Sequence, residues 1–461
     1  MPERWKNGRE SLNFTSTSVV GSGGTINPRN GYPRRMGVSV MWFYRISMMI
    51  LVPLAIPVIA LRDRLIGKKR PPWSDRFGRN LPKIEPGSLW IHAVSVGEVE
   101  VARRLIAELK RSETRIPIVV TSTTATGLAL AHKNLAEVAT VLASPIDLPG
   151  PVSRLFDSIQ PSALVLIETE LWPEMLHQAK RHTTPVVVVN ARLSDRSHRR
   201  YRLVRSALGP LLAPINLVLT RDRTDAERFS TLGIEPGRVK VGGNVKYDLE
   251  PDQRPLEWDD TIDKIAAGRP IIVAGSTLEG EEEQVLDALA VSERSVLLIL
   301  APRHPERFDS VSRLVESRGL KLIRRSRLPD QLVPTTDVFL LDTIGELARA
   351  FRHGTMAFIG GSLVPSGGHN PLEPAVWGVP VLSGPSIENF EEIYREMVGA
   401  GAVILVENPQ ALGAAINHWL SNPGEALNAG EAGRRVVEEN GGATARIATE
   451  IVEQLHQRPM P

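Results

Sequence analysis

The chain has 461 residues, 42% of them hydrophobic and 23% charged, a composition that excludes wholesale disorder and a polytopic membrane protein. It has no cysteine, which excludes disulfides, thiolate zinc sites, iron–sulfur clusters and a cysteine nucleophile. The net charge is only +3, and residues 1–79 alone carry +10, which leaves −7 for residues 80–461. Because the basic charge surrounds one N-terminal segment and the rest of the chain is acidic, we expect no nucleic-acid partner.

One N-terminal segment is apolar enough to enter a membrane. Residues 1–35, rich in Gly, Ser, Asn and Arg without periodicity, are expected to be disordered, and residues 36–64 are expected to form an anchor. Within the anchor, the apolar run from 38 to 61 has Arg45 as its only charge. As a helix it is about 36 Å long, which suffices for a hydrocarbon core of about 30 Å if Arg45 snorkels toward an interface. A helix lying in the membrane plane fits the same residues.

The residues that follow this run favour an uncleaved anchor over a secretory signal peptide. Arg62-Asp63-Arg64 stands where a cleavage site needs small residues. The basic stretch RDRLIGKKR (62–70) predicts that the rest of the chain stays on the cytoplasmic side, although Arg34 and Arg35 on the other flank weaken this signal.

After the anchor, short β-branched runs alternate with helical patterns. Strands are expected at Leu89–Val94, Ile116–Thr121, Ala163–Ile167, Val186–Val189, Leu217–Leu219, Ile271–Ala274, Val296–Leu300, Lys321–Ile323, Val338–Leu341, Met356–Ile359, Val379–Leu382 and Val403–Val406. The stretch 249–269, with its prolines and acidic residues, is interpreted as a linker. Continuous apolar strands separated by helices predict parallel sheets covered on both faces. The fold class is therefore α/β, with two doubly wound domains at 65–248 and 270–461 facing a cleft.

In the first domain, loops at the carboxyl ends of strands carry carboxylates. Glu98 opens a helix after Gly97 and can accept a proton, although a helix N-terminus favours any acidic residue. Glu168 and Glu170 stand between a strand and a helix that begins with proline, where capping explains only Glu170. Lys246, at the entrance to the linker, is suited to neutralising a phosphate but is also compatible with an ordinary exposed lysine.

In the second domain, three turns between strand and helix suit an anionic nucleotide. Pro302-Arg303 offers a guanidinium for bidentate contact with a phosphate or carboxylate. Ile344-Gly345-Glu346 lies at a similar turn, where Thr343 and Glu346 also match a capping box. The segment with the most such features is GGSLVPSGGHNPLEP (360–374). Its glycines leave backbone N–H groups free to bind a phosphate, and a helix start is expected directly after them, at Asn370-Pro371.

Other charged groups invite simpler interpretations. No spacing of His, Asp and Glu suggests a metal site, and the phosphate-binding motif GxxxxGK[ST] is missing from the sequence. The charged runs Glu279–Glu283 and Arg324–Arg327 are interpreted as solvated faces.

Taken together, the motifs are specific. The order SVGE (95–98), ETELWP (168–173), NARLS (190–194), GNVKYD (243–248), APRHPERF (301–308), DTIGEL (342–347) and GGSLVPSGGHNPLEP (360–374) closely resembles the 3-deoxy-D-manno-octulosonic acid (Kdo) transferases of lipopolysaccharide synthesis. The resemblance runs from about Met41 to near Leu455. It implies the GT-B glycosyltransferase fold, with an acceptor-binding domain at 65–248 and a CMP-Kdo-binding domain at 270–461.

The resemblance also implies a reaction and roles for residues. The family moves Kdo from CMP-Kdo to the lipid A precursor lipid IVA at the cytoplasmic face of the inner membrane, where basic residues beside the anchor suit anionic lipids. Glu98 matches the general base, and Glu168 and Lys246 match the positions that stabilise the transition state. The CMP-binding segments match Pro302, Arg303, Ile344, Gly345, Glu346, Asn370, Pro371, Leu372 and Glu373. Inversion follows from attack opposite CMP, and no metal or other cofactor is required.

Two alternatives stay open at this point. The same architecture serves sugar-nucleotide epimerases and glycosyltransferases with UDP donors, but a soluble epimerase has no use for the apolar N-terminus. A non-catalytic, membrane-anchored nucleotide-binding protein has no need of Glu98, Glu168 and Lys246 together.

Overall fold

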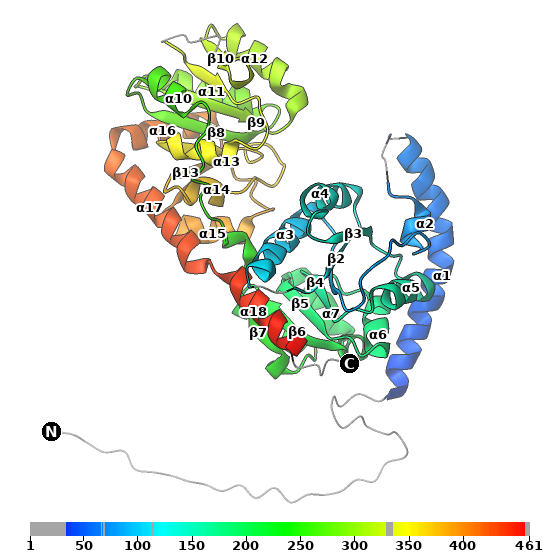
Figure 1. Ribbon diagram of the computed structural model, residues 1–461. Helices are drawn as coiled ribbons and strands as arrows, with labels where there is room; N and C mark the ends of the chain where they lie inside the picture. Colours follow the sequence, from blue (N-terminus) through cyan, green and yellow to red (C-terminus); the bar gives the residue numbers. More distant parts are fainter. Residues whose placement is uncertain (1–33, 66, 68–69, 113–114, 329–334, 457–461) are drawn as a thin grey trace, which may run out of the picture.

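Two parallel sheets form the body of the protein. The computed structural model describes residues 34–65, 67, 70–112, 115–328 and 335–456, and in this part of the chain each sheet has seven strands (Figure 1). The strand orders are β3-β2-β1-β4-β5-β6-β7 and β10-β11-β9-β8-β12-β13-β14. Two doubly wound α/β domains are therefore confirmed. The extension expected at 1–35 falls almost entirely outside the described residues.

The first domain follows a long N-terminal helix, α1 (Arg34–Leu65). Its strands are β1 (Leu89–Ala93), β2 (Ile118–Ser122), β3 (Thr140–Ala143), β4 (Ala163–Ile167), β5 (Val186–Ala191), β6 (Ile215–Thr220) and β7 (Val239–Val241). Its helices are α2 (Trp73–Arg76), α3 (Val96–Arg111), α4 (Ala125–Leu135), α5 (Pro149–Ile159), α6 (Pro173–Arg181), α7 (Asp195–Leu203), α8 (Arg205–Leu212), α9 (Arg223–Thr231) and the 3₁₀ turns η1 (Pro236–Arg238) and η2 (Val245–Tyr247). The short strands β3 and β7 were not expected from the sequence.

The second domain repeats the pattern. Its strands are β8 (Ile271–Thr277), β9 (Leu297–Pro302), β10 (Leu322–Arg324), β11 (Val338–Leu340), β12 (Met356–Ile359), β13 (Val381–Ser383) and β14 (Val403–Leu405). Its helices are α10 (Asp259–Ala266), α11 (Glu281–Ala290), η3 (Pro305–Arg307), α12 (Phe308–Ser317), η4 (Arg325–Arg327), α13 (Leu347–Ala350), η5 (Phe351–His353), α14 (Leu372–Ala375), α15 (Glu391–Gly399), α16 (Pro409–Ser421) and α17 (Pro423–Asn440). The last helix, α18 (Ala443–His456), follows α17.

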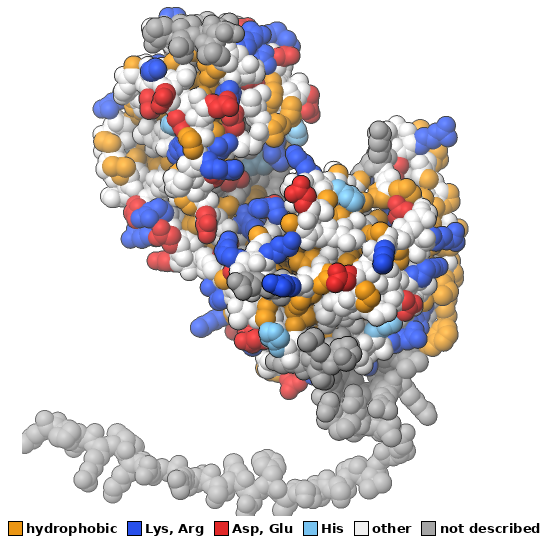
Figure 2. Space-filling model, in the orientation of Figure 1, with side chains coloured by type: hydrophobic (Ala, Val, Ile, Leu, Met, Phe, Trp, Pro, Cys, Tyr) orange, Lys and Arg blue, Asp and Glu red, His pale blue; other side chains and the backbone are white. Residues whose placement is uncertain are grey.

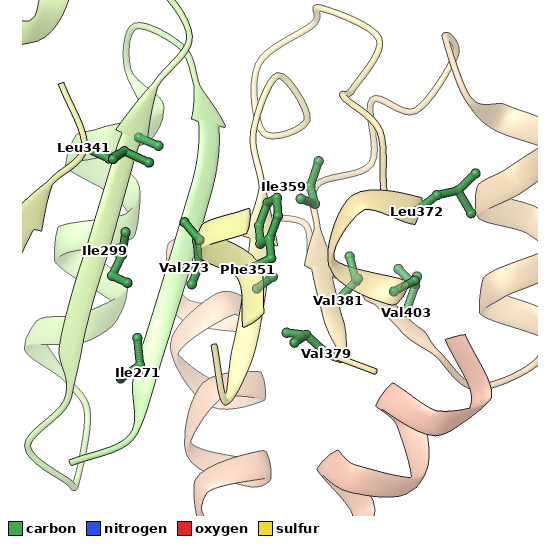
Figure 3. Close-up of a cluster of buried hydrophobic side chains, with 14 of the residues drawn as sticks. Ile271, Val273, Ile299, Leu341, Phe351, Ile359, Leu372, Val379, Val381 and Val403 are labelled. Atoms are coloured by element: carbon green, nitrogen blue, oxygen red, sulfur yellow. The ribbon is translucent and has the colours of Figure 1, made fainter. Parts of the chain in front are cut away.

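Each sheet separates two apolar layers, which explains the unbroken hydrophobic runs of its strands. Along β4, Val165 contributes to the layer beneath α3 and α4, while Leu164 and Leu166 contribute to the layer beneath α5 and α6. The second sheet is built in the same way, and Figure 3 shows one of its layers, where Val273, Ile299 and Phe351 meet. Burial on both faces is what a parallel sheet in a doubly wound fold requires.

The stretch interpreted as a linker, 249–269, belongs largely to the second domain. Trp258 is only 1% exposed and packs on Phe339, with ring centroids 5.0 Å apart. Leu256 and Ile262 join the same core, and α10 continues it to Ala266. Most of the prolines and acidic residues that suggested a linker are exposed, while Pro251, Asp252 and Asp259 are half-buried. The second domain therefore begins before residue 270.

The C-terminus also crosses the expected boundary. α17 runs along the second domain, but α18 packs on α3 of the first domain (Figure 1). Its residues Ala443, Ile447 and Ile451 complete the apolar layer that also contains Val165. An amphipathic helix can cover either sheet, so its sequence alone does not say which domain it joins. The first domain therefore comprises residues from both ends of the chain.

Asp248, where the chain leaves the first domain, contacts the start of α18, where the chain returns to it. Its carboxylate accepts hydrogen bonds from the backbone N–H groups of Ala443 (3.1 Å) and Thr444 (2.5 Å) and from the Thr444 hydroxyl. The side chain thus caps the N-terminus of α18 from a segment 195 residues earlier.

We expect Asp248→Ala to lower the free energy of unfolding by about 1–2 kcal/mol, because three N-terminal hydrogen bonds of α18 lose their acceptor. Urea denaturation of the purified protein measures this change. Asp252→Ala is the matched control, since within the described residues Asp252 pairs with the exposed Arg254 and, at 3.7 Å, with the half-buried Arg349, and its effect should stay within about 0.5 kcal/mol. Equal effects of the two substitutions would contradict the capping role.

Candidate active site

The candidate residues gather where each sheet reverses its strand order. In the first sheet the reversal falls between β1 and β4, whose carboxyl ends lead to Glu98 and Glu168. In the second it falls between β8 and β12, which lead to Glu281 and to the glycine-rich segment at Gly360. Such switch points are the preferred ligand sites of doubly wound sheets. In Figure 2 the two domains meet across a hollow that has Lys and Arg side chains on its rim.

Glu98 combines a structural contact with the properties of a base. Its carboxylate accepts hydrogen bonds from the Val94 N–H and the Ser95 hydroxyl, both at 2.8 Å, and Ser95 caps α3 in return. Burial raises the pKa of Glu98 to about 7, against the effect of these hydrogen bonds, and the charges of Glu168 and Glu170 raise it further. A carboxylate that is half protonated near neutral pH is well suited to general base catalysis.

Glu168 follows β4 in a conformation that few residues adopt. Its φ of +61° lies in the left-handed region, which is uncommon outside glycine and is concentrated at functional sites. Its carboxylate pairs with Arg221, which follows β6, at 2.5 Å. The Arg221 side chain is only 2% exposed, and its Nε atom has no hydrogen-bond partner among the described residues. The pair holds Glu168 beside Glu98 and Lys246.

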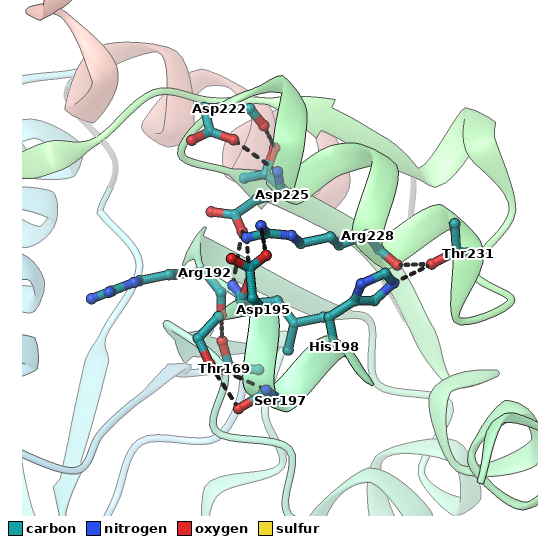
Figure 4. Close-up of polar contacts among 12 residues, drawn as sticks. Thr169, Arg192, Asp195, Ser197, His198, Asp222, Asp225, Arg228 and Thr231 are labelled. Carbon is teal, nitrogen blue, oxygen red and sulfur yellow. Dashed lines mark hydrogen bonds and ion pairs between the residues drawn. The ribbon is translucent and has the colours of Figure 1, made fainter. Parts of the chain in front are cut away.

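A network of polar contacts joins three of the sequence motifs. Thr169 of ETELWP donates a hydrogen bond to the Arg192 carbonyl of NARLS (Figure 4). Asn190 of NARLS, with φ of +52°, accepts the Val245 N–H of GNVKYD at 3.1 Å. Figure 4 also shows Asp225 and Arg228 of α9 against the segment after Arg192, whose own side chain extends away from them. The loops that bear Glu168 and Lys246 are therefore fixed relative to each other.

Lys246 reaches from the first domain to the second. Its ammonium group lies 3.5 Å from the Asn389 carbonyl and 4.5 Å from the centre of the Phe390 ring. The Asn389 side chain in turn donates hydrogen bonds to the carbonyls of Ser366 and Gly368 in the glycine-rich segment. Burial, and next the charge of Arg221, lower the pKa of Lys246 to about 8. A cation therefore stands between the carboxylates and the glycine-rich segment.

The glycine-rich segment is held by Glu281, which the sequence had suggested to be solvated. Glu281 and Glu282 are fully buried, which contradicts the interpretation of Glu279–Glu283 as a solvated face. The Glu281 carboxylate accepts the N–H groups of Gly361, Ser362 and Leu363 at 2.6–2.9 Å. Glu282 forms a bidentate ion pair with Arg307. These contacts fix the backbone that leads to Asn370.

The other predicted nucleotide-binding residues of this segment lie on one turn. Asn370 accepts the Leu372 N–H at 3.1 Å, but α14 starts at Leu372 with Pro371 in the cap position, one residue later than the sequence suggested, and has only four residues, so its dipole is small. Pro371 and Leu372 are buried, and Glu373 is half-buried beside Asn370. Burial raises the pKa of Glu373, while Asn370 and the charge of Arg303 act in the opposite direction. Arg303 is exposed directly after the buried Pro302, close enough to interact with Glu373.

The third predicted segment is only partly free to bind a ligand. The Glu346 carboxylate is engaged by Arg325, by the Trp258 indole N–H and by the Thr343 hydroxyl. Because α13 starts only at Leu347, Thr343 does not cap it in the way that the capping-box alternative supposed. Ile344 is 73% exposed, and Gly345 has open space around its Cα. The backbone of Ile344 and Gly345 remains accessible to a ligand.

Sequence reasoning missed three residues of this site: Arg221, Glu281 and Asn389. Arg221 directly follows the strand β6, and the rule that ligands meet the carboxyl ends of strands could have singled it out. Glu281 carries no comparable signal, since its backbone donors come about 80 residues later in the chain. Asn389 likewise depends on contacts with Lys246 and the glycine-rich segment that only the fold creates.

We expect a reaction that uses Glu98 as base and Lys246 as cation to follow a narrow bell-shaped pH profile. Below the pKa of Glu98, about 7, the base is protonated and kcat/KM should fall about tenfold per pH unit. Above the pKa of Lys246, about 8, the cation is lost and the rate should fall again. In Lys246→Arg, any remaining activity should lack the alkaline limb, since arginine stays charged. A flat profile between roughly pH 6 and pH 9 would contradict both roles.

Known proteins resemble this chain over most of its length. A family model described as "3-Deoxy-D-manno-octulosonic-acid transferase (kdotransferase)" matches residues 72–249. The 3-deoxy-D-manno-octulosonic acid transferase of Haemophilus influenzae is 35% identical over 418 residues, which cover 88% of this chain and 97% of the relative. That of Bordetella pertussis is 31% identical over 399 residues, 82% of this chain and 91% of the relative.

The solved structure of a protein named for a different activity shares the fold. A putative UDP-N-acetylglucosamine 2-epimerase from Listeria monocytogenes superposes with a TM-score of 0.53 at 14% sequence identity, covering 82% of this chain and 99% of its own. At that identity the likeness concerns the two-domain architecture alone.

Proposed function

Because the chain belongs to the 3-deoxy-D-manno-octulosonic acid (Kdo) transferase family, we propose that it moves Kdo from CMP-Kdo to lipid IVA with inversion at the anomeric carbon. Membership makes the protein a glycosyltransferase of lipopolysaccharide biosynthesis. One observation carries the finer proposal. The charge of Glu168 acts both on Glu98, a carboxylate with a pKa of about 7, and on the cation Lys246, which contacts Asn389 beside the glycine-rich segment of the other domain.

Glu98 acts as the general base of the proposed reaction. Its carboxylate takes the proton of the acceptor sugar hydroxyl as the hydroxyl oxygen bonds to the anomeric carbon of Kdo. The bond from that carbon to the CMP phosphate breaks, and its electron pair leaves with CMP. Attack from the face opposite CMP gives inversion. Glu98 belongs to the first domain and the glycine-rich segment to the second, and this division between base and donor site supports the proposed geometry.

Positive groups stabilise the charge that develops on the departing phosphate. We assign this role to Lys246 and Arg303, with backbone N–H groups around Asn370 in support. Glu168, held by Arg221, lies near Lys246, and its negative charge favours the ammonium form of that lysine. Ile344, Gly345 and the turn from Pro371 to Glu373 complete the CMP-binding surface, with Pro302 and Glu346 holding its backbone. The second domain, 270–440 together with α10, is then the donor domain.

We propose that the acceptor binds to the first domain, at the membrane. Within the described residues, α1 contains one stretch, Met41–Leu65, that is long and apolar enough to cross a membrane by length and composition. The basic residues near it suit anionic lipids and a bisphosphorylated acceptor. We propose that the protein works at the cytoplasmic face of the inner membrane, where CMP-Kdo is available from solution and the lipid acceptor from the bilayer.

The direct test incubates the purified full-length protein with CMP-Kdo and lipid IVA in detergent and determines the mass of the lipid product. The expected result is one or more added Kdo units, together with release of CMP. A product that retains the mass of lipid IVA, from a protein that still binds CMP, would overturn the assignment of the acceptor. UDP-N-acetylglucosamine in place of CMP-Kdo should give no sugar transfer and no epimerisation.

A further inference from the structure

Helix α1 packs on the first domain along most of its length. In Figure 1 it runs beside the domain, and it contacts α6 and α8. Apart from the half-buried Ser47, its buried and half-buried side chains recur every three or four residues, a stripe that we call the inner stripe: Met41, Tyr44, Arg45, Met48, Val52, Ile56, Ile59 and Asp63. A stripe with this period is one face of a helix. The face that meets the domain therefore extends from one end of the apolar segment to the other.

Polar contacts fix the inner stripe in place. Arg45 forms a bidentate ion pair with Glu174 of α6, at 2.7 and 2.9 Å, and the Glu174 side chain is fully buried. The Tyr44 hydroxyl donates a hydrogen bond to Asp147 at 2.6 Å. Near the other end, Asp63 pairs with Arg70 in the segment that directly follows the helix. A spanning helix would require Arg45 to snorkel to an interface. Instead, the charge of Arg45 is neutralised within the protein by Glu174.

The opposite face of α1, its outer face, is apolar and unpartnered in the described chain. Its large side chains have exposed fractions of 52–77%: Trp42, Phe43, Ile46, Met49, Ile50, Leu51, Leu54, Val58, Leu61 and Leu65. Figure 2 shows hydrophobic and basic side chains along this edge of the molecule. Such a continuous patch marks an interaction surface.

Charge near the outer face indicates what covers it. Arg62 and Arg64 are exposed at the end of α1. α8 packs on α1, and α7, which leads into α8, exposes Arg199, Arg200 and Arg202 and ends at Leu203, which is 86% exposed. Apolar side chains bordered by arginines fit an anionic bilayer, whose acyl chains take the former and whose head groups take the latter.

We propose that α1 lies in the plane of the membrane, with its outer face in the boundary between head groups and acyl chains and its inner stripe fixed to the catalytic domain. A spanning α1 would need either to break the contacts of Arg45 and Tyr44 or to carry α6, α8 and the buried Glu174 into hydrocarbon. Both are costly, since unpaired charges and polar groups are strongly disfavoured there. This inference deepens the membrane attachment in the proposed function and rests on it.

The absence of cysteine from the sequence makes the orientation directly measurable, because each introduced thiol is unique. We would place Cys at either end of α1 in the full-length protein, as Gly37→Cys and Arg64→Cys, and in the second domain as Glu425→Cys. A membrane-impermeant maleimide should label all three from the same face of sealed inner-membrane vesicles. Labelling of Gly37→Cys only from the face opposite Glu425→Cys would overturn the in-plane orientation. Neither labelling result depends on transferase activity, so this test of the orientation can fail or succeed independently of the proposed reaction.

A second measurement tests the outer face itself. The double variant Leu54→Asp, Val58→Asp should bind vesicles of phosphatidylglycerol and phosphatidylethanolamine about tenfold more weakly or worse in a flotation assay, because two apolar side chains no longer enter the bilayer. Leu427→Asp is the matched control: Leu427 is 71% exposed on α17 of the second domain, and its substitution should leave binding unchanged. Unchanged binding of the double variant would overturn the proposal.

Discussion

Glu98→Gln is expected to lower kcat for Kdo transfer by about 10²–10⁴-fold, the usual contribution of a general base, while the affinity for CMP stays unchanged. Glutamine is the informative substitution because it has nearly the same shape and can still hydrogen-bond to the Val94 N–H and the Ser95 hydroxyl at the start of α3. The variant therefore separates the catalytic role of Glu98 from its structural role. Single-turnover transfer to lipid IVA and CMP titration by calorimetry provide the two measurements.

Glu100→Gln is the control, since Glu100 lies in the same helix and its ion pairs within the described chain are with the partly exposed Arg103 and Arg104. Its transfer rate should match that of the unaltered protein within about twofold. If Glu98→Gln retained a comparable rate, the pKa of about 7 would reflect burial alone and another group would have to accept the proton.

Trp258→Ala is expected to lower the free energy of unfolding of the second domain by about 3–5 kcal/mol, the cost of a large cavity in a packed core. The indole is in ring contact with Phe339 and His353, and its N–H donates to Glu346 at 3.3 Å. Urea denaturation, followed by a signal from the second domain, measures the loss. Binding of CMP should weaken as well, since Glu346 loses one of its anchors beside Gly345.

The exposed Trp42 gives the contrast for this experiment. Trp42→Ala removes the same side chain from the outer face of α1, where it is 60% exposed, and should change the free energy of unfolding in detergent by no more than about 0.5 kcal/mol. A similarly small effect of Trp258→Ala would mean that residues 249–269 behave as the linker that their composition suggests.

How far the sequence could predict the fold depended on whether the deciding contacts were local. The strands β4 and β12 match their expected bounds residue for residue, because an apolar run between helices reports burial on both faces directly. Periodicity and starting residues likewise predict helices at Ala125–Leu135 and Pro173–Arg181, which are the observed bounds of α4 and α6. The three-residue strand β7 carries too little pattern to be recognised, since two of its residues are exposed at the edge of the sheet.

Contacts between distant segments account for what could not be predicted. The run Glu279–Glu283 has the composition of a solvated helix start, and only the backbone of Gly361–Leu363 makes Glu281 a buried acceptor. Arg45 has the sequence context of a snorkelling side chain until Glu174 is brought beside it by α6. Within the site, single motifs were ambiguous, and their order along the chain carried more information than the chemistry of any one residue.

The packing of α18 on the first domain has a consequence for biosynthesis. The layer around Val165 and α3 lacks Ile447 and Ile451 until the last helix is made, so the first domain to be translated is the last to complete its core. During synthesis the second domain, closed by α17, folds while the first still exposes apolar surface. A chain that stalls before residue 443 leaves that surface uncovered, which makes it a substrate for chaperones and proteases. The helix α18 thereby links the stability of the first domain to the synthesis of residues 443–456.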